Sequence, residues 1–65
     1  MTVKEAKDQL PTVKVQFGKK TYWCLVRGRL NQFASVYVPE KQWLGAEFSW
    51  ESIAWAATNN TTLKA

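Results

Sequence analysis

The sequence predicts a mainly β fold, a small and partly open barrel of four or five short antiparallel strands with a short C-terminal helix at about residues 49–58. Apolar and polar residues alternate over residues 12–17, and further stretches rich in β-forming residues follow at short intervals. The apolar spacing becomes helical only after Ser49. The 65 residues leave room for one domain, over residues 12–65, behind a flexible segment over residues 1–11.

The first ten residues are polar and lack a convincing apolar stripe. Two outcomes are open for them, a frayed helical turn around "KEAKDQL" or no regular structure. Pro11 ends the segment, because proline fixes φ and disfavours a helical conformation in the residue before it.

The first two strands are predicted to form a hairpin. Gly18 and Lys19 suit a two-residue loop of type II′, which has glycine at its first central position. The resulting register places Lys14 opposite Trp23, and a slip of one residue would exchange the two faces. The inner face then carries Val13, Val15, Phe17, Tyr22, Cys24 and Val26, and the outer face Lys14, Gln16, Thr21, Trp23, Leu25 and Arg27.

Two more strands are expected after this hairpin. Gly28 either opens the loop "RGRLNQ" or marks a bulge. The stretch "FASVYV", residues 33–38, is apolar on both faces, as expected of a central strand in a curved sheet, and Pro39 ends it. The stretch "WLGAEF", residues 43–48, predicts a shorter fourth strand in which Gly45 allows a bend or a close approach.

The C-terminal helix begins after Ser49, a favourable N-cap, and Glu51 suits the positive end of its dipole. Its apolar stripe consists of Trp50, Ile53, Ala54 and Ala57. "TNN" ends the helix, and "TTLKA" either adds a short last strand or trails off. This order and size of elements is similar to that of SH3-like barrels, a likeness that says little about function.

The composition argues against catalysis and metal binding. The chain has no histidine and one cysteine, Cys24, which excludes ordinary zinc sites and an internal disulfide. We expect Cys24 to be a small buried apolar residue rather than a reactive thiol. No secretory signal and no membrane-spanning stretch is visible. The expectation is a non-enzymatic cytoplasmic protein without cofactor or metal and without a membrane partner.

The net charge of +4 is unevenly distributed. No acidic residue lies between Asp8 and Glu40, whereas the remainder of the chain has four basic and five acidic residues. Such a patch either attracts anionic partners or is a solvated hairpin whose lysines discourage aggregation. The basic residues of this interval are Lys14, Lys19, Lys20, Arg27 and Arg29.

These five residues and Trp23 are the predicted nucleic-acid-binding residues. Cations neutralise phosphates, and an exposed indole ring can stack on an unpaired base, so single strands are favoured. The competing interpretation is that Trp23 packs inside the barrel while Lys14 and Arg27 cover its edge with their aliphatic stems.

A protein-interaction module or accessory subunit is the alternative function, with the basic hairpin docking an acidic protein. Trp55 lies off the apolar stripe of the helix, and together with Trp43 it is a candidate interface residue in a monomer or a homodimer. The structural explanation is that Trp55 covers the barrel mouth or packs on residues 1–10.

Overall fold

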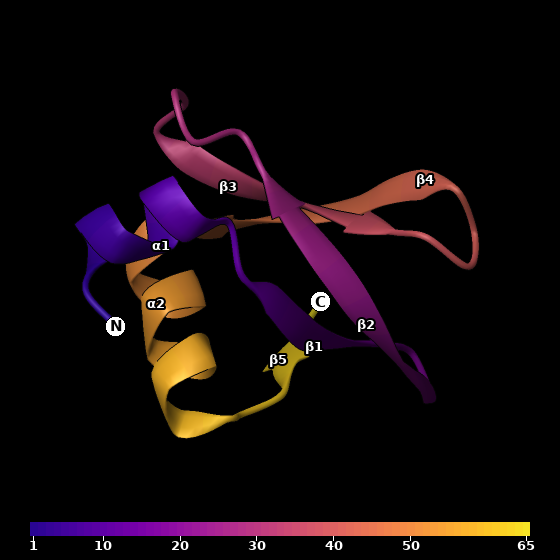
Figure 1. The fold of residues 1–65 in the computed structure, drawn as a ribbon. Coiled ribbons are helices and arrows are strands. Elements are labelled where there is room, and N and C mark those ends of the chain that lie inside the picture. The colour runs from indigo at the N-terminus through magenta and orange to yellow at the C-terminus, as the bar shows by residue number, and fades with distance from the viewer.

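The computed structural model describes the backbone of residues 1–65 and the side chains of all of them except residues 43 and 44. Two helices and five strands follow one another along the chain (Figure 1). They are α1 (Val3–Gln9), β1 (Thr12–Phe17), β2 (Lys20–Arg27), β3 (Phe33–Val38), β4 (Trp43–Ser49), α2 (Trp50–Asn59) and β5 (Leu63–Lys64).

The strands form one sheet in the order β4-β3-β2-β1-β5, and the sheet curls around the helices as a half-barrel (Figure 1). The predicted mainly β, partly open barrel with a short C-terminal helix is therefore confirmed. One detail differs, since β5 pairs parallel to β1 and all other pairs are antiparallel. The connection through α2 carries the chain across the open side, so that β5 enters beside β1 in the same direction.

The hairpin of β1 and β2 has the predicted register. Lys14 pairs with Trp23, and Phe17 pairs with Lys20 across the two-residue loop. Gly18 has a φ of 62° and Lys19 is not among the residues of positive φ, as a type II′ turn requires. The inner and outer faces of this hairpin are therefore as expected.

The core lies between the inner face of the sheet and α2. Trp50 and Ile53 are its largest residues from the helix, and the Trp50 Nε1–H group donates a hydrogen bond to the Asn31 carbonyl at 3.2 Å. Of the predicted stripe, Trp50, Ile53 and Ala54 are buried, and Ala57 is half-buried and packs against the core. Ala56, which was not part of the predicted stripe, is buried as well. The buried residues are Ala6, Val13, Val15, Cys24, Val26, Ala34, Val36, Val38, Trp50, Ile53, Ala54 and Ala56.

Residues 1–11, expected as a flexible segment, contain a helix that contributes to this core. The Thr2 hydroxyl accepts a hydrogen bond from the Glu5 main-chain N–H, and the Glu5 carboxylate accepts one from the Thr2 main-chain N–H. This reciprocal capping box begins α1. Ala6 is fully buried, and α1 packs against α2. Of the two outcomes open for this segment, the structure has the helix.

Two further positions show why the sheet bends and where α2 stops. The pairing of β3 with β4 shifts between Val36 and Tyr37, which leaves Gly45 as the extra residue of a bulge. The helix α2 has Ser49 as its N-cap and Asn60 as its C-cap, and the φ of Asn60 is 52°. Among the residues described, no helix is long and apolar enough to cross a membrane.

Candidate nucleic-acid interface

The outer face of β1, β2 and β3 carries no packed helix. The core side chains and both helices lie on the inner side of the sheet, and alternate residues of each strand point the other way. Trp23 on β2 is 56% exposed and Phe33 on β3 is 53% exposed. Large exposed aromatic side chains of this kind are a feature of binding surfaces.

Trp23 and Lys14 form the centre of this surface. Their backbones are directly paired, and the Lys14 Nζ atom lies 5.0 Å from the centroid of the Trp23 ring. The interpretation in which Trp23 packs inside the barrel is contradicted by its exposure. An exposed cation–π contact is worth about 0.5–1 kcal/mol, so the ammonium group can move from the ring to a phosphate at little cost.

A second cation–aromatic pair lies beside the first. Arg27 carries its guanidinium Cζ atom 4.2 Å from the centroid of the Tyr37 ring. Leu25 pairs with Tyr37, and Arg27 pairs with Ser35, so these side chains lie on one face. The guanidinium group of Arg27 therefore contacts the ring of Tyr37, whereas the cation at the Trp23 ring is that of Lys14.

Sequence reasoning missed Phe33 and Tyr37 as members of this face. Both faces of residues 33–38 are apolar, which predicts a central strand in a curved sheet and does not mark either face as exposed. Only the inward residues are fully buried, namely Ala34, Val36 and Val38. The sequence does contain a sign of their exposure. Phe33, Ser35 and Tyr37 are alternate residues of one strand and lie on the same face, and the polar Ser35 suits a face that is open to solvent.

Lys19 and Lys20 are both exposed at the tip of the hairpin. The Gln16 side-chain amide donates a hydrogen bond to the Gly18 carbonyl at 3.0 Å, which ties the turn to β1. Lys19 lies in the turn itself, whereas Lys20 pairs with Phe17 and lies on the same side of the hairpin as the inner-face residues. The tip therefore holds two positive charges at the end of the hairpin, where they can attract an anionic ligand.

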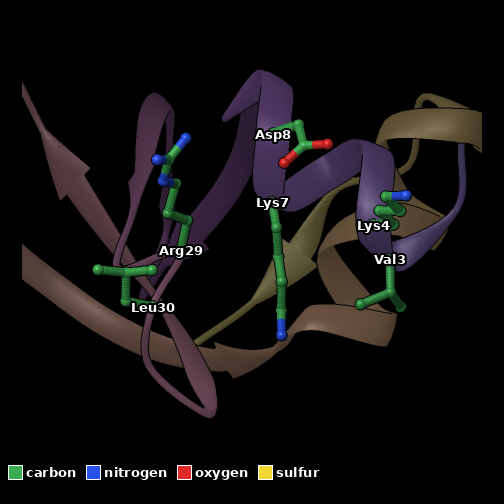
Figure 2. Close-up of a pocket in the computed structure, with 6 residues that line it drawn as sticks. All are labelled: Val3, Lys4, Lys7, Asp8, Arg29 and Leu30. Atoms are coloured by element: carbon green, nitrogen blue, oxygen red, sulfur yellow. The ribbon is translucent and has the colours of Figure 1, made fainter.

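Arg29 lies apart from the other five predicted residues. It is in the loop after β2, at a hollow of about 460 Å³ between this loop and α1. Figure 2 shows the Arg29 and Lys7 side chains extending in opposite directions, so their charged ends do not converge on one point. The hollow is lined by Val3, Lys4, Lys7, Asp8, Arg29 and Leu30.

Of the two tryptophans proposed for a protein interface, Trp55 and Trp43, the structure describes the side chain of Trp55. Trp55 is 57% exposed on α2 and lies between two surface hollows of about 400 and 440 Å³. The first hollow includes Val3 and the second includes Leu63. The side chain of Trp43 lies outside the described residues.

Cys24 takes no part in the surface. Its side chain is buried in the core, and the thiol donates a long hydrogen bond to the Tyr22 carbonyl at 3.6 Å. Burial raises the pKa of the Cys24 thiol, which keeps it protonated and unreactive near neutral pH. The expectation of a buried apolar residue is confirmed.

No protein-family model, curated protein or solved structure matches this chain. Function is therefore inferred from the surface itself, from the groups that it exposes and the ligands that those groups can bind.

Proposed function

We propose that this chain is a small, basic, non-enzymatic module that binds single-stranded nucleic acid on the outer face of β1, β2 and β3. The observation that carries the proposal is the half-exposed Trp23 ring with the Lys14 ammonium 5.0 Å from its centroid, on a face that no helix covers. A flat ring for a base and a cation for its phosphate are the two groups that such a ligand requires.

The distribution of charge supports an anionic ligand. Lys14 and Arg27 lie on the outer face, Lys19 lies in the turn at the end of the hairpin, and Lys20 pairs with Phe17 next to that turn. Glu47 on β4 is exposed and pairs with Ser35, which pairs with Arg27, so one acidic residue lies on this face as well, at the edge strand. Binding should weaken steeply as salt is added, because each phosphate contact releases condensed counterions.

The aromatic residues support a single strand rather than a duplex. Trp23, Phe33 and Tyr37 present rings on the same side of the sheet. In a duplex the bases stack on one another, whereas the bases of a single strand can stack on protein rings. A cytoplasmic location, expected from the lone cysteine, belongs to the same proposal.

The test is an NMR titration of ¹⁵N-labelled protein with hexathymidylate at low and at moderate salt, with a duplex as the control. We expect shifts of the Lys14 and Arg27 amides and the Trp23 indole N–H, all smaller at higher salt. The Trp55 indole N–H should not move. An absence of shifts at low salt, or shifts centred on Trp55, would contradict the proposal.

Docking of an acidic protein partner is the second candidate function, and the exposure of Trp55 favours a protein interface. If this function holds, Trp55→Ala should abolish binding of an acidic partner, and hexathymidylate should leave every resonance unchanged. Glu51 borders both hollows beside Trp55 and would repel an acidic partner there, which is why this function ranks second.

A further inference from the structure

A hollow of about 290 Å³ lies between β3 and β4 on the outer face of the sheet. Ser35 and Glu47 line it, together with Gly45 and Ala46. Ser35 alternates with buried residues of β3, and Glu47 is its direct partner on β4, so both side chains belong to the outer face. Gly45, the extra residue of the bulge, has no side chain that could fill this space.

Two polar side chains at this hollow are available to a ligand. Among the described residues, neither the Ser35 hydroxyl nor the Glu47 carboxylate has a hydrogen-bond or ion-pair partner. Ser35 is half-buried and Glu47 is exposed. The Cβ atoms of directly paired residues are about 5 Å apart, so one group of a ligand can contact both side chains.

The chemistry of these two side chains suits a hydroxyl group of a sugar. A serine hydroxyl can donate a hydrogen bond, whereas an ionised carboxylate only accepts. The 2′-hydroxyl of ribose is both a donor and an acceptor, so it complements the pair, and it is the group that distinguishes RNA from DNA. A carboxylate also holds the ribose 2′-hydroxyl in dinucleotide-binding proteins. The negative charge of Glu47 disfavours a phosphate at the same place.

The hollow lies in line with a cation of the proposed interface. Arg27 on β2 pairs with Ser35 on β3, and Ser35 pairs with Glu47 on β4. The row therefore presents a cation, a hydroxyl and a carboxylate in this order, and its two ends are about 10 Å apart, which is twice the spacing of neighbouring strands. A phosphate bound by Arg27 would bring the adjoining sugar toward the other two side chains.

We propose that this hollow is a ribose subsite. A nucleotide whose phosphate contacts Arg27 donates a hydrogen bond from its 2′-hydroxyl to the Glu47 carboxylate and accepts one from the Ser35 hydroxyl. This inference rests on the proposed function and deepens it, because it makes single-stranded RNA the preferred ligand. The acidic residue on an otherwise basic face then has a role in choosing the sugar.

The test compares hexauridylate with the hexamer of deoxyuridylate, which differs from it in the 2′-hydroxyl groups alone. We expect the ribose hexamer to bind about tenfold more tightly, the effect of one added hydrogen bond to a charged group at an exposed site. Fluorescence anisotropy of the two labelled hexamers measures this ratio. In an NMR titration, the Ser35 and Glu47 amides should shift more with the ribose hexamer.

Glu47→Ala removes the acceptor and should reduce the ratio of the two affinities to about one, without weakening the deoxyribose hexamer. Glu51→Ala is the matched control, because it removes one negative charge from an exposed residue of α2, which lies on the other side of the sheet. It should leave the ratio at about tenfold. A preference that persists in Glu47→Ala would overturn the subsite.

The outcomes separate this inference from the proposed function. Equal affinity of the two hexamers for the unaltered protein, with both weakened by Trp23→Ala, would overturn the ribose subsite and leave the proposed function intact. If neither hexamer binds to the unaltered protein, both proposals fail.

Discussion

Two glycines with positive φ occupy turns that differ in how crowded they are. A Cβ atom at Gly18 would meet nothing within 4 Å, whereas one at Gly28 would lie 3.2 Å from Asn31 Nδ2 and 3.4 Å from the Phe33 carbonyl oxygen. The turn at Gly28 is also held by a hydrogen bond of 2.9 Å from the Asn31 N–H to the Gly28 carbonyl.

We expect Gly18→Ala to lower the free energy of unfolding by about 1 kcal/mol, the cost of a positive φ for a residue with a side chain. Gly28→Ala should lower it further, because the new methyl group meets main chain as well. Thermal denaturation measures both changes, at about 4–8 °C of Tm per kcal/mol in a domain of this size. A larger loss of unfolding free energy in Gly18→Ala than in Gly28→Ala would contradict the crowding described at Gly28.

A substitution at Lys14 tests the contribution of positive charge to the proposed nucleic-acid binding. Replacing it with glutamine should flatten the plot of log affinity for hexathymidylate against log salt by about 0.7, the slope expected for one phosphate contact on a single strand. Lys4→Gln, on the exposed side of α1, is the matched control and should leave the slope unchanged. Equal changes in the two variants would mean that binding is diffuse and that Lys14 has no special place in it.

Among the elements, α1 depends on a titratable cap. Hydrogen bonding to Thr2 holds the pKa of the Glu5 carboxyl below its usual value. The main-chain N–H of Thr2 has the larger effect on this pKa, and the Thr2 side chain has the smaller one. A carboxyl whose pKa is lower in the folded state stabilises the fold above its unfolded pKa. This stabilisation is lost as the pH falls through the folded pKa.

Glu5→Gln retains the reciprocal hydrogen bond and cannot titrate. The unaltered protein should therefore have the higher Tm near neutral pH, and its advantage should shrink as the pH is lowered from about 7 to about 3. Thermal unfolding of both proteins across this range checks the expectation. A constant difference in Tm at every pH would exclude Glu5 as the responsible group.

The start of α2 is tied to the loop after β2 by one buried side chain. Trp50→Phe removes the hydrogen bond to the Asn31 carbonyl and some buried ring area, so we expect the free energy of unfolding to fall by about 1–3 kcal/mol. The exposed Trp55 gives the control, and Trp55→Phe should change stability by less than about 0.5 kcal/mol. Denaturant unfolding distinguishes the two, and similar losses would contradict the assigned packing.

Elements whose residues interact locally could be predicted from the sequence. The alternation of residues 12–17 and the Gly18 turn determine the hairpin register, and Ser49 and Asn60 bound α2. The parallel pairing of β5 and the packing of α1 could not be predicted, because each depends on residues distant in the chain. In the candidate site, the proximity of Lys14 and Trp23 could be predicted because the two residues are cross-strand neighbours. The position of Arg29 could not be predicted, because Arg29 lies in the loop after Gly28, next to α1 and apart from the other basic residues.

At the scale of the whole molecule, the sheet has two unlike sides. Both helices lie on the inner side, where every large fully buried side chain is found, and the outer side is left with Trp23, Leu25 and Phe33 exposed. A chain of 65 residues has little apolar surface to spare for its core, so the aromatic residues that lie outside the core are the basis of the proposed binding role.

The most direct test of this account is fluorescence anisotropy of labelled hexathymidylate titrated with Trp23→Ala and, in parallel, Trp55→Ala. The two tryptophans are matched, since they are 56% and 57% exposed, and only Trp23 lies on the outer face of the sheet. We predict that Trp23→Ala weakens binding by about 5- to 150-fold, the loss of one stacked base, while Trp55→Ala binds like the unaltered protein. Equal losses in the two variants, or a loss confined to Trp55→Ala, would contradict the assignment of the outer face as the nucleic-acid interface.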